Sequence, residues 1–250
     1  MQRFTDRFAD RVVLVTGGSS GIGAATARRL AAEGASVVIA ARHADQGKAT
    51  AASIDGDVTF VHCDVTVEID VSRLVATIVE KYGRLDGAFN NAGATGFHGL
   101  ISDMDGVSWR AELDANLTSV FYCLKYEIAA MTGGGAIVNN ASIAAVGGIP
   151  GLSAYTAAKH GVLGLTRAAA LEWVAQNVRV NAIVTGNVDT PLYRRLSGVG
   201  ADDALPAAPN PTGRTASPDE IAAFVAYLLS DEAAFVTGAG LPIDGGSTAT

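Results

Sequence analysis

A tyrosine and a lysine four positions apart carry the clearest chemical signal in the sequence. Tyr155 and Lys159 occur in the stretch Ser-Ala-Tyr-Thr-Ala-Ala-Lys, and residues at i and i+4 share one face of a helix. A phenol with an ordinary pKa of about 10 is a poor base at neutral pH, but a nearby ammonium group lowers that pKa by roughly 1–3 units. The pair could therefore act as general acid and base on an alcohol or a carbonyl group. Alone, such a pair is more often a solvated surface pair.

A glycine-rich turn near the N-terminus is the second motif. After the apolar run 12–15, residues 16–23 read Thr-Gly-Gly-Ser-Ser-Gly-Ile-Gly. Glycines permit a tight turn and let backbone N–H groups approach a pyrophosphate, and a following helix adds a favourable dipole. Because no Gly-Lys-Ser/Thr follows, the turn is not a nucleoside-triphosphate loop. The pattern predicts a dinucleotide site formed by Gly17, Ser19, Ser20, Gly21, Ile22 and Gly23.

The end of the second apolar run bears on which dinucleotide is bound. An acidic residue there would accept hydrogen bonds from the adenosine ribose and repel a 2′-phosphate. Residues 38–43 instead read Val-Ile-Ala-Ala-Arg-His, and the guanidinium of Arg42 matches the geometry and charge of a phosphate. We therefore expect NADP(H) to be favoured, with NAD(H) as the alternative. The competing interpretation is that Arg42 stacks on adenine or faces water.

The elements that must position these residues follow from the apolar pattern. Short, continuously apolar runs alternate with longer segments of helical periodicity, as in parallel strands covered on both faces. The strand candidates are 12–15, 37–39, 58–61, 85–89, 136–139, 178–183 and 240–243, and the helix candidates are 24–34, 71–82, 109–131, 153–176 and 218–230. The alternation predicts an α/β fold, with one Rossmann-like domain over residues 1–250. Its doubly wound, seven-stranded and mainly parallel sheet should have helices on both faces.

One stretch does not fit this alternation. Residues 187–214 contain four of the seven prolines together with three glycines. A connection of this length inside a compact domain is usually functional, so we expect a lid over a substrate site, and a passive surface loop is the alternative. The apolar side chains that such a lid would offer a substrate are Leu192, Tyr193, Leu196, Val199 and Leu205.

Composition limits the class of protein and its partners. Apolar residues make up 49% of the chain and charged residues 17%, a balance that excludes a disordered chain. The net charge of −7 disfavours binding to nucleic acid and to anionic membranes. The sequence has no apolar run typical of a signal peptide or a membrane span, and its two cysteines, Cys63 and Cys123, form no disulfide framework or metal cage. We expect a reduced, cytoplasmic protein without a metal.

Together these motifs resemble the short-chain dehydrogenase/reductase family, in its plain subclass of about 250 residues, which is the length of this chain. The resemblance covers nearly the whole sequence. The matching motifs are Thr16-Gly-x-x-x-Gly-x-Gly23, Asp64-Val65, Asn90-Asn91-Ala92-Gly93 and, in order, Asn116, Ser142, Tyr155 and Lys159. Ser142 precedes Tyr155 by 13 positions, the usual spacing in the family.

The resemblance implies a role for each residue of the site. Tyr155 would protonate the carbonyl oxygen in reduction or deprotonate the alcohol in oxidation, and Ser142 would donate to the same oxygen. Lys159 would lower the pKa of Tyr155 and bind the nicotinamide ribose, and Asn116 would hold a water that links Lys159 to solvent. The nicotinamide would carry the hydride. Besides Tyr155 and Lys159, the implied cofactor contacts are Asp64, Val65, Asn91, Ala92, Gly93, Gly186, Val188 and Thr190.

Two positions depart from the family pattern. Thr185 stands before Gly186 where the family usually has proline. The fixed φ of proline is lost there, so we expect a looser or differently shaped lid entrance. Ala141 stands where a second serine is frequent, a change that matters little because Ser142 remains.

The resulting hypothesis is an NADP(H)-dependent oxidoreductase that interconverts a ketone and a secondary alcohol on a small molecule. Two other enzymes remain open. One is a 3-oxoacyl-[acyl-carrier-protein] reductase, for which Arg194 and Arg195 could meet an acidic carrier protein. The other is an NAD-dependent dehydrogenase of a cyclic alcohol or cis-diol. A cofactor-sensing protein without turnover should lack one of Ser142, Tyr155 and Lys159, and all three are present.

The resemblance also bears on assembly. In relatives, helices like 109–131 and 153–176 pack across a two-fold axis, and the ending 243–246 resembles that of tetrameric members. We therefore expect a homotetramer or a homodimer. The competing interpretation is that these apolar helices pack only against the sheet of their own chain.

Overall fold

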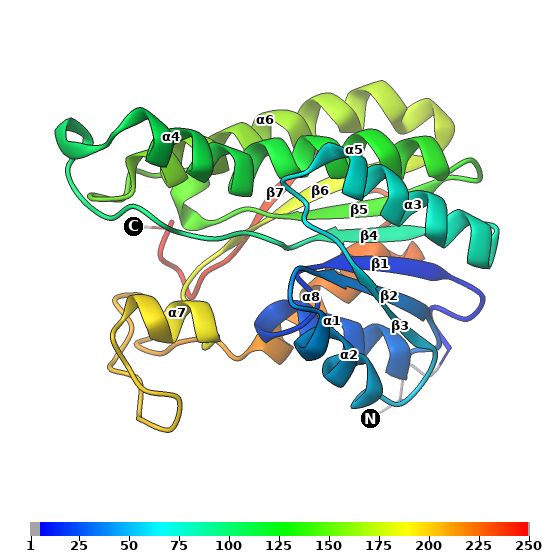
Figure 1. Ribbon diagram of the computed structural model, residues 1–250, viewed down its shortest axis with the longest axis horizontal. Coiled ribbons are helices and arrows are strands. Elements are labelled where there is room, and N and C mark those ends of the chain that lie inside the picture. Colours follow the sequence, from blue (N-terminus) through cyan, green and yellow to red (C-terminus); the bar gives the residue numbers. More distant parts are fainter. Residues whose placement is uncertain (1–5, 250) are drawn as a thin grey trace.

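Seven parallel strands form one sheet in the computed structural model, which describes residues 6–249 (Figure 1). The strands are β1 (Val12–Thr16), β2 (Ser36–Ala41), β3 (Val58–His62), β4 (Gly87–Asn90), β5 (Gly135–Asn140), β6 (Val178–Thr185) and β7 (Gly240–Ile243). Their order is β3-β2-β1-β4-β5-β6-β7, and every pairing is parallel. All seven predicted strands are confirmed, and the sheet is wholly rather than mainly parallel.

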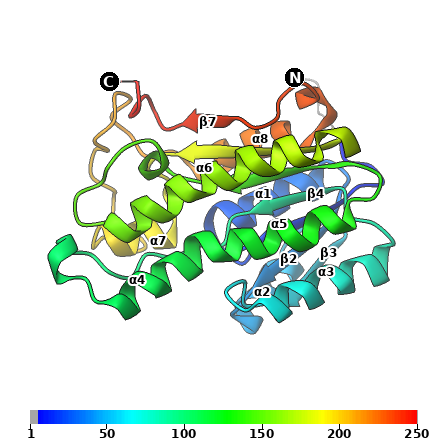
Figure 2. The same ribbon diagram turned by 90° about the horizontal axis from the view of Figure 1, so that it is seen from above.

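Helices cover both faces of the sheet, as predicted (Figures 1 and 2). One face carries α1 (Gly21–Ala32), α2 (Ala44–Ala52) and α8 (Pro218–Leu229), and the other carries α3 (Glu68–Tyr82), α4 (Gly106–Leu113), α5 (Ser119–Ala130) and α6 (Ser153–Trp173). The short helix α7 (Pro191–Leu196) lies beyond the carboxyl ends of the strands. Single 3₁₀ turns occur at Ile101–Asp103, Ile143–Ala145, Val174–Gln176 and Asp231–Ala233. Among residues 6–249, no helix has the length and apolar character needed to span a membrane.

Each face of the sheet has its own apolar core. Leu74 and Ile78 of α3 pack with residues of α5 and α6 on one face, and Leu30 of α1 packs with Ile221 and Val225 of α8 on the other. Burial of one such side chain contributes about 1.5–3 kcal/mol. Because both faces are covered, all five residues of β1 are buried, and this explains why its sequence is continuously apolar.

Local sequence sets where helices begin and end. Ser217 and Glu220 form a capping box at the start of α8, and Gly83 ends α3 with a φ of 74°, a left-handed conformation that favours glycine. In α1 the N-cap is Ser20, whose side chain makes no cap hydrogen bond. The first N–H groups of α1 are therefore left for another acceptor.

The predicted helix 109–131 is interrupted by a turn of π-helix. Residues Asp114–Thr118 join α4 to α5, and the N–H of Ser119 bonds to the carbonyl of Asp114, five residues back. Such turns are rare and occur frequently at functional sites. Asn116 lies in this turn and is fully buried.

The proline-rich segment 187–214 leaves the end of β6, forms α7 and then runs without regular structure toward α8 (Figure 1). An isolated parallel bridge between Val188 and Ala216 closes its base. Arg194 fastens the segment internally: its guanidinium pairs with Asp189 at 2.5 and 2.7 Å and donates to two backbone carbonyls, both at 2.9 Å. The lid assignment stays a prediction.

Candidate active site

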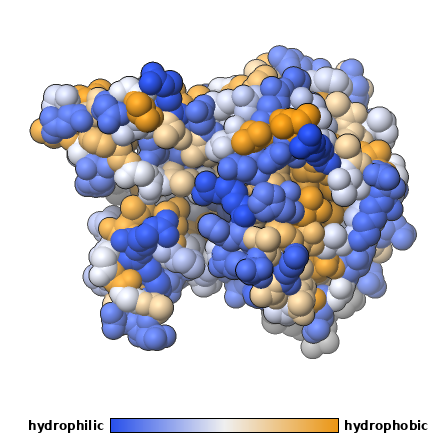
Figure 3. All heavy atoms as spheres, in the orientation of Figure 1, coloured by the Kyte–Doolittle hydropathy of each residue, from blue (hydrophilic) through white to orange (hydrophobic). Residues whose placement is uncertain are grey.

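A cleft opens at the carboxyl ends of the strands, where the strand order reverses between β1 and β4 (Figure 3). Open α/β sheets bind ligands at such a point. The cavity has a volume of about 430 Å³. Most residues that the sequence predicted for the site line it: Gly17, Ser19, Ser20, Gly21, Ile22, Arg42, Asp64, Val65, Asn91, Ala92, Gly93, Asn116, Tyr155, Lys159 and Thr190.

Three predicted contact residues lie behind the wall of the cavity instead. A Cβ atom at Gly23 would overlap the carbonyl oxygen of Gly17, so Gly23 allows α1 to pack tightly on the turn. A Cβ at Gly186 would lie 2.7 Å from the Cα of Asp244. Val188 is buried. These residues shape the cavity from behind.

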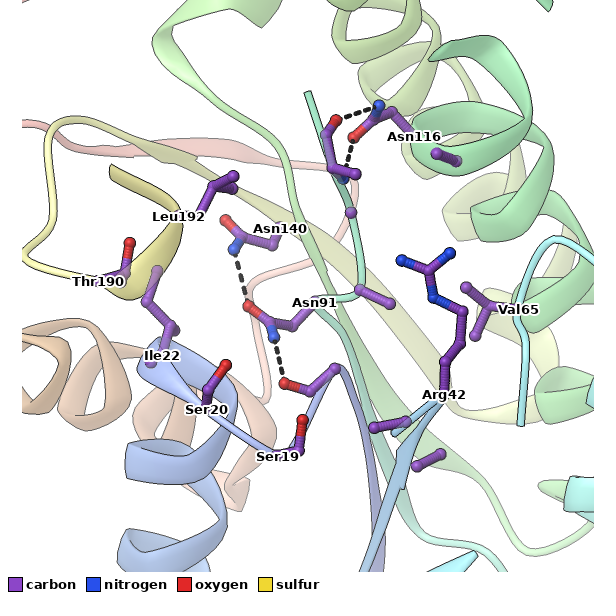
Figure 4. Close-up of a pocket in the computed structure, with 18 of the residues that line it drawn as sticks. Ser19, Ser20, Ile22, Arg42, Val65, Asn91, Asn116, Asn140, Thr190 and Leu192 are labelled. Carbon is purple, nitrogen blue, oxygen red and sulfur yellow. Dashed lines mark hydrogen bonds between the residues drawn. The ribbon is translucent and has the colours of Figure 1, made fainter. Parts of the chain in front are cut away.

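The glycine-rich turn has the backbone conformation that its sequence predicts. Gly17 and Gly21 have φ angles of 63° and 51°, and a Cβ at Gly17 would lie 2.9 Å from Nδ2 of Asn91. The start of α1 borders the cavity, with Ser19, Ser20 and Ile22 at one side of it (Figure 4). Uncapped N–H groups at a helix N-terminus suit a negatively charged pyrophosphate, so this part of the cavity fits a dinucleotide.

Side-chain hydrogen bonds tie together the ends of four strands across the floor of the cleft. Asn91 donates from Nδ2 to the carbonyl of Thr16 at 3.1 Å, and its Oδ1 accepts from Nδ2 of Asn140 at 3.0 Å (Figure 4). Oδ1 of Asn140 in turn accepts from the hydroxyl of Thr185 at 2.6 Å. A proline at 185 could not make this bond. The expected loosening at Thr185 is therefore offset, because the hydroxyl ties β6 to β5.

The four predicted catalytic residues gather at one end of the cavity. Nζ of Lys159 lies 5.5 Å from the centre of the Tyr155 ring and donates to the carbonyl of Asn140 at 2.8 Å. The Ser142 side chain hydrogen-bonds with Tyr155. Asn116 comes close as well, since Gly93 lies beside both its Oδ1 and Nζ of Lys159. Tyr155, Lys159 and Asn116 line the cavity directly, and Ser142 is joined to them through its hydrogen bond with Tyr155.

The electrostatics of the tyrosine–lysine pair differ from the expectation. Burial raises the pKa of Tyr155 above its ordinary value; the hydrogen bond with Ser142 lowers it, and the charge of Glu112 raises it further. Burial also lowers the pKa of Lys159 to about 8, although Glu112 opposes that shift. The sequence predicted a lowered tyrosine pKa, which is wrong for this structure. Desolvation of the phenol outweighs the hydrogen bond with Ser142, which lowers the pKa of Tyr155.

The far end of the cavity carries positive charge. Arg42 is exposed and extends beside Val65 (Figure 4). Burial alone would raise the pKa of Asp64, but hydrogen bonds from Thr66 at 3.0 and 2.7 Å and the charges of Arg42 and His62 hold it below its ordinary value. Asp64, which follows β3, is therefore bound to Thr66 and interacts electrostatically with Arg42. No acidic residue occurs among residues 40–43 at the end of β2.

Comparison with known proteins agrees with this geometry. A family model described as enoyl-(acyl carrier protein) reductase matches residues 17–248. The 2,5-dichloro-2,5-cyclohexadiene-1,4-diol dehydrogenase of Sphingobium indicum is 42% identical over 244 residues, which are 96% of this chain and 97% of the relative. The cyclohexanol dehydrogenase of an Acinetobacter species is 39% identical over 249 residues, 98% of this chain and 97% of the relative.

The chain belongs to the short-chain dehydrogenase/reductase family. The crystal structure of levodione reductase, 39% identical, superposes on this short-chain dehydrogenase/reductase with a TM-score of 0.92 and covers 97% of this chain and 99% of its own. The protein is accordingly an oxidoreductase of alcohol and carbonyl groups on small molecules, and it uses NAD(P).

Sequence reasoning missed several residues of this dehydrogenase/reductase site. Arg195 lines the cavity, whereas its neighbour Arg194 is bound to Asp189 within the lid segment. The two arginines that could have met a carrier protein thus have different surroundings. This difference is visible only in the three-dimensional structure, because the two residues are neighbours in the sequence. Glu112, a buried carboxylate, gave no signal because its partners lie elsewhere in the chain. The other cavity residues that were not assigned to the site include His43, Gln46, Cys63, Thr66 and Asn140.

Proposed function

We propose that the protein is an NADP(H)-dependent oxidoreductase that interconverts a secondary alcohol on a six-membered carbon ring and the corresponding ketone. The observation that carries the proposal is the gathering of Ser142, Tyr155 and Lys159 in the cleft that begins at the glycine-rich turn. The ring substrate is supported by relatives named for cyclohexanol and a cyclohexadiene diol.

Each catalytic side chain has a task that its position supports. In reduction, the hydroxyl of Tyr155 gives its proton to the carbonyl oxygen, and in oxidation it takes the proton of the alcohol. Ser142 donates a hydrogen bond to the same oxygen, where negative charge grows in the transition state. Lys159 stabilises the phenolate that Tyr155 becomes. The bound nicotinamide supplies or accepts the hydride.

The choice of NADP(H) rests on Arg42. Its guanidinium is exposed at the far end of the cavity, beside Val65, where a 2′-phosphate would find a charge-assisted partner. No carboxylate at the end of β2 competes for it. The missing carboxylate argues against NAD(H), because in NAD-dependent sites an acidic residue at this position binds the ribose hydroxyls.

The substrate end of the cavity favours an uncharged molecule. Leu192 of the lid segment, Ala94 and Ala115 line the cavity along with the catalytic residues. Such small apolar walls suit a hydrocarbon ring, and Arg195 is the charged side chain of the lid segment that also lines the cavity. A cyclic secondary alcohol fits this wall better than a charged hydroxy acid.

The proposal is tested by following absorbance at 340 nm with cyclohexanol, a cyclohexane cis-diol and 2-hexanol, each with NADP⁺ and with NAD⁺. We expect the ring alcohols to be oxidised faster than the open-chain alcohol, and kcat/KM to be higher with NADP⁺. Equal or higher kcat/KM with NAD⁺ would refute the cofactor choice. A preference for 2-hexanol would refute the ring substrate.

Replacement of Arg42 isolates its contribution. In Arg42→Ala we expect kcat/KM with NADP⁺ to fall by at least about tenfold, the effect of one charge-assisted hydrogen bond, while kcat/KM with NAD⁺ stays within about threefold. The matched control is Arg28→Ala, which removes an exposed guanidinium on α1 whose ion pair with Asp219 is long, at 3.9 Å. An equal fall in kcat/KM with both cofactors would show that Arg42 does not bind the 2′-phosphate.

A further inference from the structure

One buried charge next to the catalytic residues has no role so far. Glu112 of α4 is only 5% exposed. Its Oε1 accepts the backbone N–H groups of Gly96 and Phe97, and its Oε2 accepts Nδ2 of Asn116 at 3.2 Å. Every one of these partners is a donor, so the site suits an ionised carboxylate, which only accepts. A buried charge is costly unless hydrogen bonds satisfy it, and here three of them do.

The Glu112 carboxylate acts together with two backbone carbonyls to set which way the Asn116 amide points. Nδ2 of Asn116 donates to the carboxylate and to the backbone carbonyl of Glu112 at 3.1 Å, and also to the carbonyl of Ala94 at 2.7 Å. Reversal of the amide would place its oxygen against three acceptors. Oδ1 is therefore directed to the N–H of Ala94 at 3.2 Å, beside Gly93, which Lys159 also borders.

The charge of Glu112 acts on both members of the proton-transferring pair. It raises the pKa of Lys159 against the effect of burial, and it raises the pKa of Tyr155. The titratable groups that face the Lys159 amine are Tyr155 on α6 itself and Glu112 from α4, while β5 contributes the carbonyl of Asn140. The charge of Glu112 partly offsets the effect of burial on Lys159.

We propose that Glu112 is a positioning residue of this active site. Its carboxylate supports the orientation of Asn116, holds segment 94–97 against α4 and places a negative charge near the Tyr155–Lys159 pair. The inference rests on the proposed function, because it assumes that Tyr155 and Lys159 move the proton. A carboxylate that only tied segment 94–97 in place would leave the pH dependence of turnover unchanged.

The test compares three variants in the full-length enzyme. Glu112→Gln keeps the shape, removes the charge and sets an N–H donor against Asn116. Glu112→Asp keeps the charge on a shorter side chain. The matched control is Asp105→Asn, which removes an exposed carboxylate from the N-terminus of the same helix, where it accepts the N–H groups of Val107 and Ser108. The pH profile of kcat/KM, the melting temperature and hydrogen exchange at Gly96 and Phe97 are measured for each.

Loss of a nearby negative charge lowers the pKa of both groups, so both limbs of the Glu112→Gln profile should move to lower pH, by at least about 0.5 unit. We expect kcat to fall at least about tenfold, and the amides of Gly96 and Phe97 to exchange faster. Glu112→Asp should retain the wild-type limbs, and Asp105→Asn should move neither limb. This expectation for Glu112→Asp keeps the test decisive even where Glu112→Gln folds poorly.

Two outcomes are distinguishable. The role of Glu112 would be overturned if the limbs of the Glu112→Gln profile stayed in place. It would also be overturned if the limbs of the Glu112→Asp profile moved as far as those of Glu112→Gln. In either case, turnover by the wild type would still support the proposed function. Substantial turnover by Tyr155→Phe would remove the proposed function itself, and the role of Glu112 with it.

Discussion

The proposed chemistry depends on one phenol that gives up and takes back a proton. Tyr155 is half-buried, and burial raises its pKa. The positive charge that must stabilise its phenolate comes from Lys159, whose own pKa is lowered to about 8 by burial. At neutral pH Lys159 therefore retains its proton, and at alkaline pH it loses the charge that supports Tyr155.

Removal of the phenol hydroxyl isolates this step. Tyr155→Phe should fold and bind the cofactor nearly as the wild type does, and should lose most turnover. Tyr227→Phe, which removes a hydroxyl from α8, is the matched control and should keep its turnover. Retention of more than about a tenth of the wild-type kcat by Tyr155→Phe, a barrier change below roughly 1.4 kcal/mol, would disprove the acid–base role. Circular dichroism and the Kd for the cofactor separate this result from misfolding.

At the residue scale, short motifs could be read from the sequence and long-range partners could not. Tyr155 and Lys159 were recognisable because four positions define one helix face. Glu112 was not, because its hydrogen bonds reach segment 94–97, which follows β4. The direction in which the pKa of Tyr155 shifts could not be predicted from the sequence either, because it depends on how much water the fold removes from the phenol.

Among the elements, β6 illustrates how a family position can change without loss of order. Thr185 at its end donates to Oδ1 of Asn140 on β5 at 2.6 Å, and it is 7% exposed. The strand that leads into the lid segment is thus held to the strand that precedes Ser142. A hydroxyl replaces the rigidity that a proline ring would give.

Replacement of Thr185 by valine keeps the shape and removes the donor. We expect Thr185→Val to lower the free energy of unfolding by about 1–2 kcal/mol, because Oδ1 of half-buried Asn140 loses its partner. Urea denaturation measures the change. Thr77→Val on the exposed side of α3, whose hydroxyl bonds within its own helix, should cost less than about 0.5 kcal/mol. Equal costs for the two variants would show that the Thr185 bond does not hold β6.

Elements with a strong periodic pattern were predictable, and short or irregular ones were not. All seven strands were predicted because both of their faces are buried. Helix α2 was missed because only Gly47 among its residues is buried, so it has no apolar stripe. Helix α7 was missed because its six residues lie in a proline-rich segment. The π turn between α4 and α5 has no periodic signature, so the prediction ran straight through it.

Across the whole molecule, a polar network passes through the apolar core between α5 and α6. Asn90 on β4 donates to Glu127 at 2.9 Å and to Asn139 at 3.0 Å, and Asn139 donates to Thr166 at 3.0 Å. Glu127 is fully buried, and burial raises its pKa to about 7 although the bond from Asn90 opposes this. Its Oε1 has no partner among the described residues.

This carboxyl should make stability depend on pH. The folded protein keeps the Glu127 proton up to about pH 7, whereas the unfolded chain releases it near its ordinary pKa of 4.5. The folded form therefore binds more protons between these values, and stability falls as pH rises through that window. Glu127→Gln should be more stable than the wild type at pH 8, by about 3 kcal/mol at most, and similar to it near pH 4.5.

Urea denaturation at several pH values checks this expectation, and Glu80→Gln at the exposed end of α3 is the control. The result expected for Glu80→Gln is a curve parallel to that of the wild type. Parallel curves for Glu127→Gln and the wild type would show that Glu127 does not titrate in this range.

Assembly stays a prediction at this scale. Phe121 on α5 is 47% exposed and Leu171 on α6 is 80% exposed. These are the kind of side chains that an interface between copies of this chain would bury. The resemblance to the family predicts a homotetramer or a homodimer.

The π turn has a consequence for engineering by recombination. It holds one extra residue in a wider turn on the helical path from Gly106 to Ala130. Deletion of a single residue in 114–118 would convert this turn into regular α-helix and remove the local geometry that places Asn116 against Ala94 and Glu112. A chimera with a relative should therefore exchange this path whole, with its crossover points before Gly106 and after Ala130.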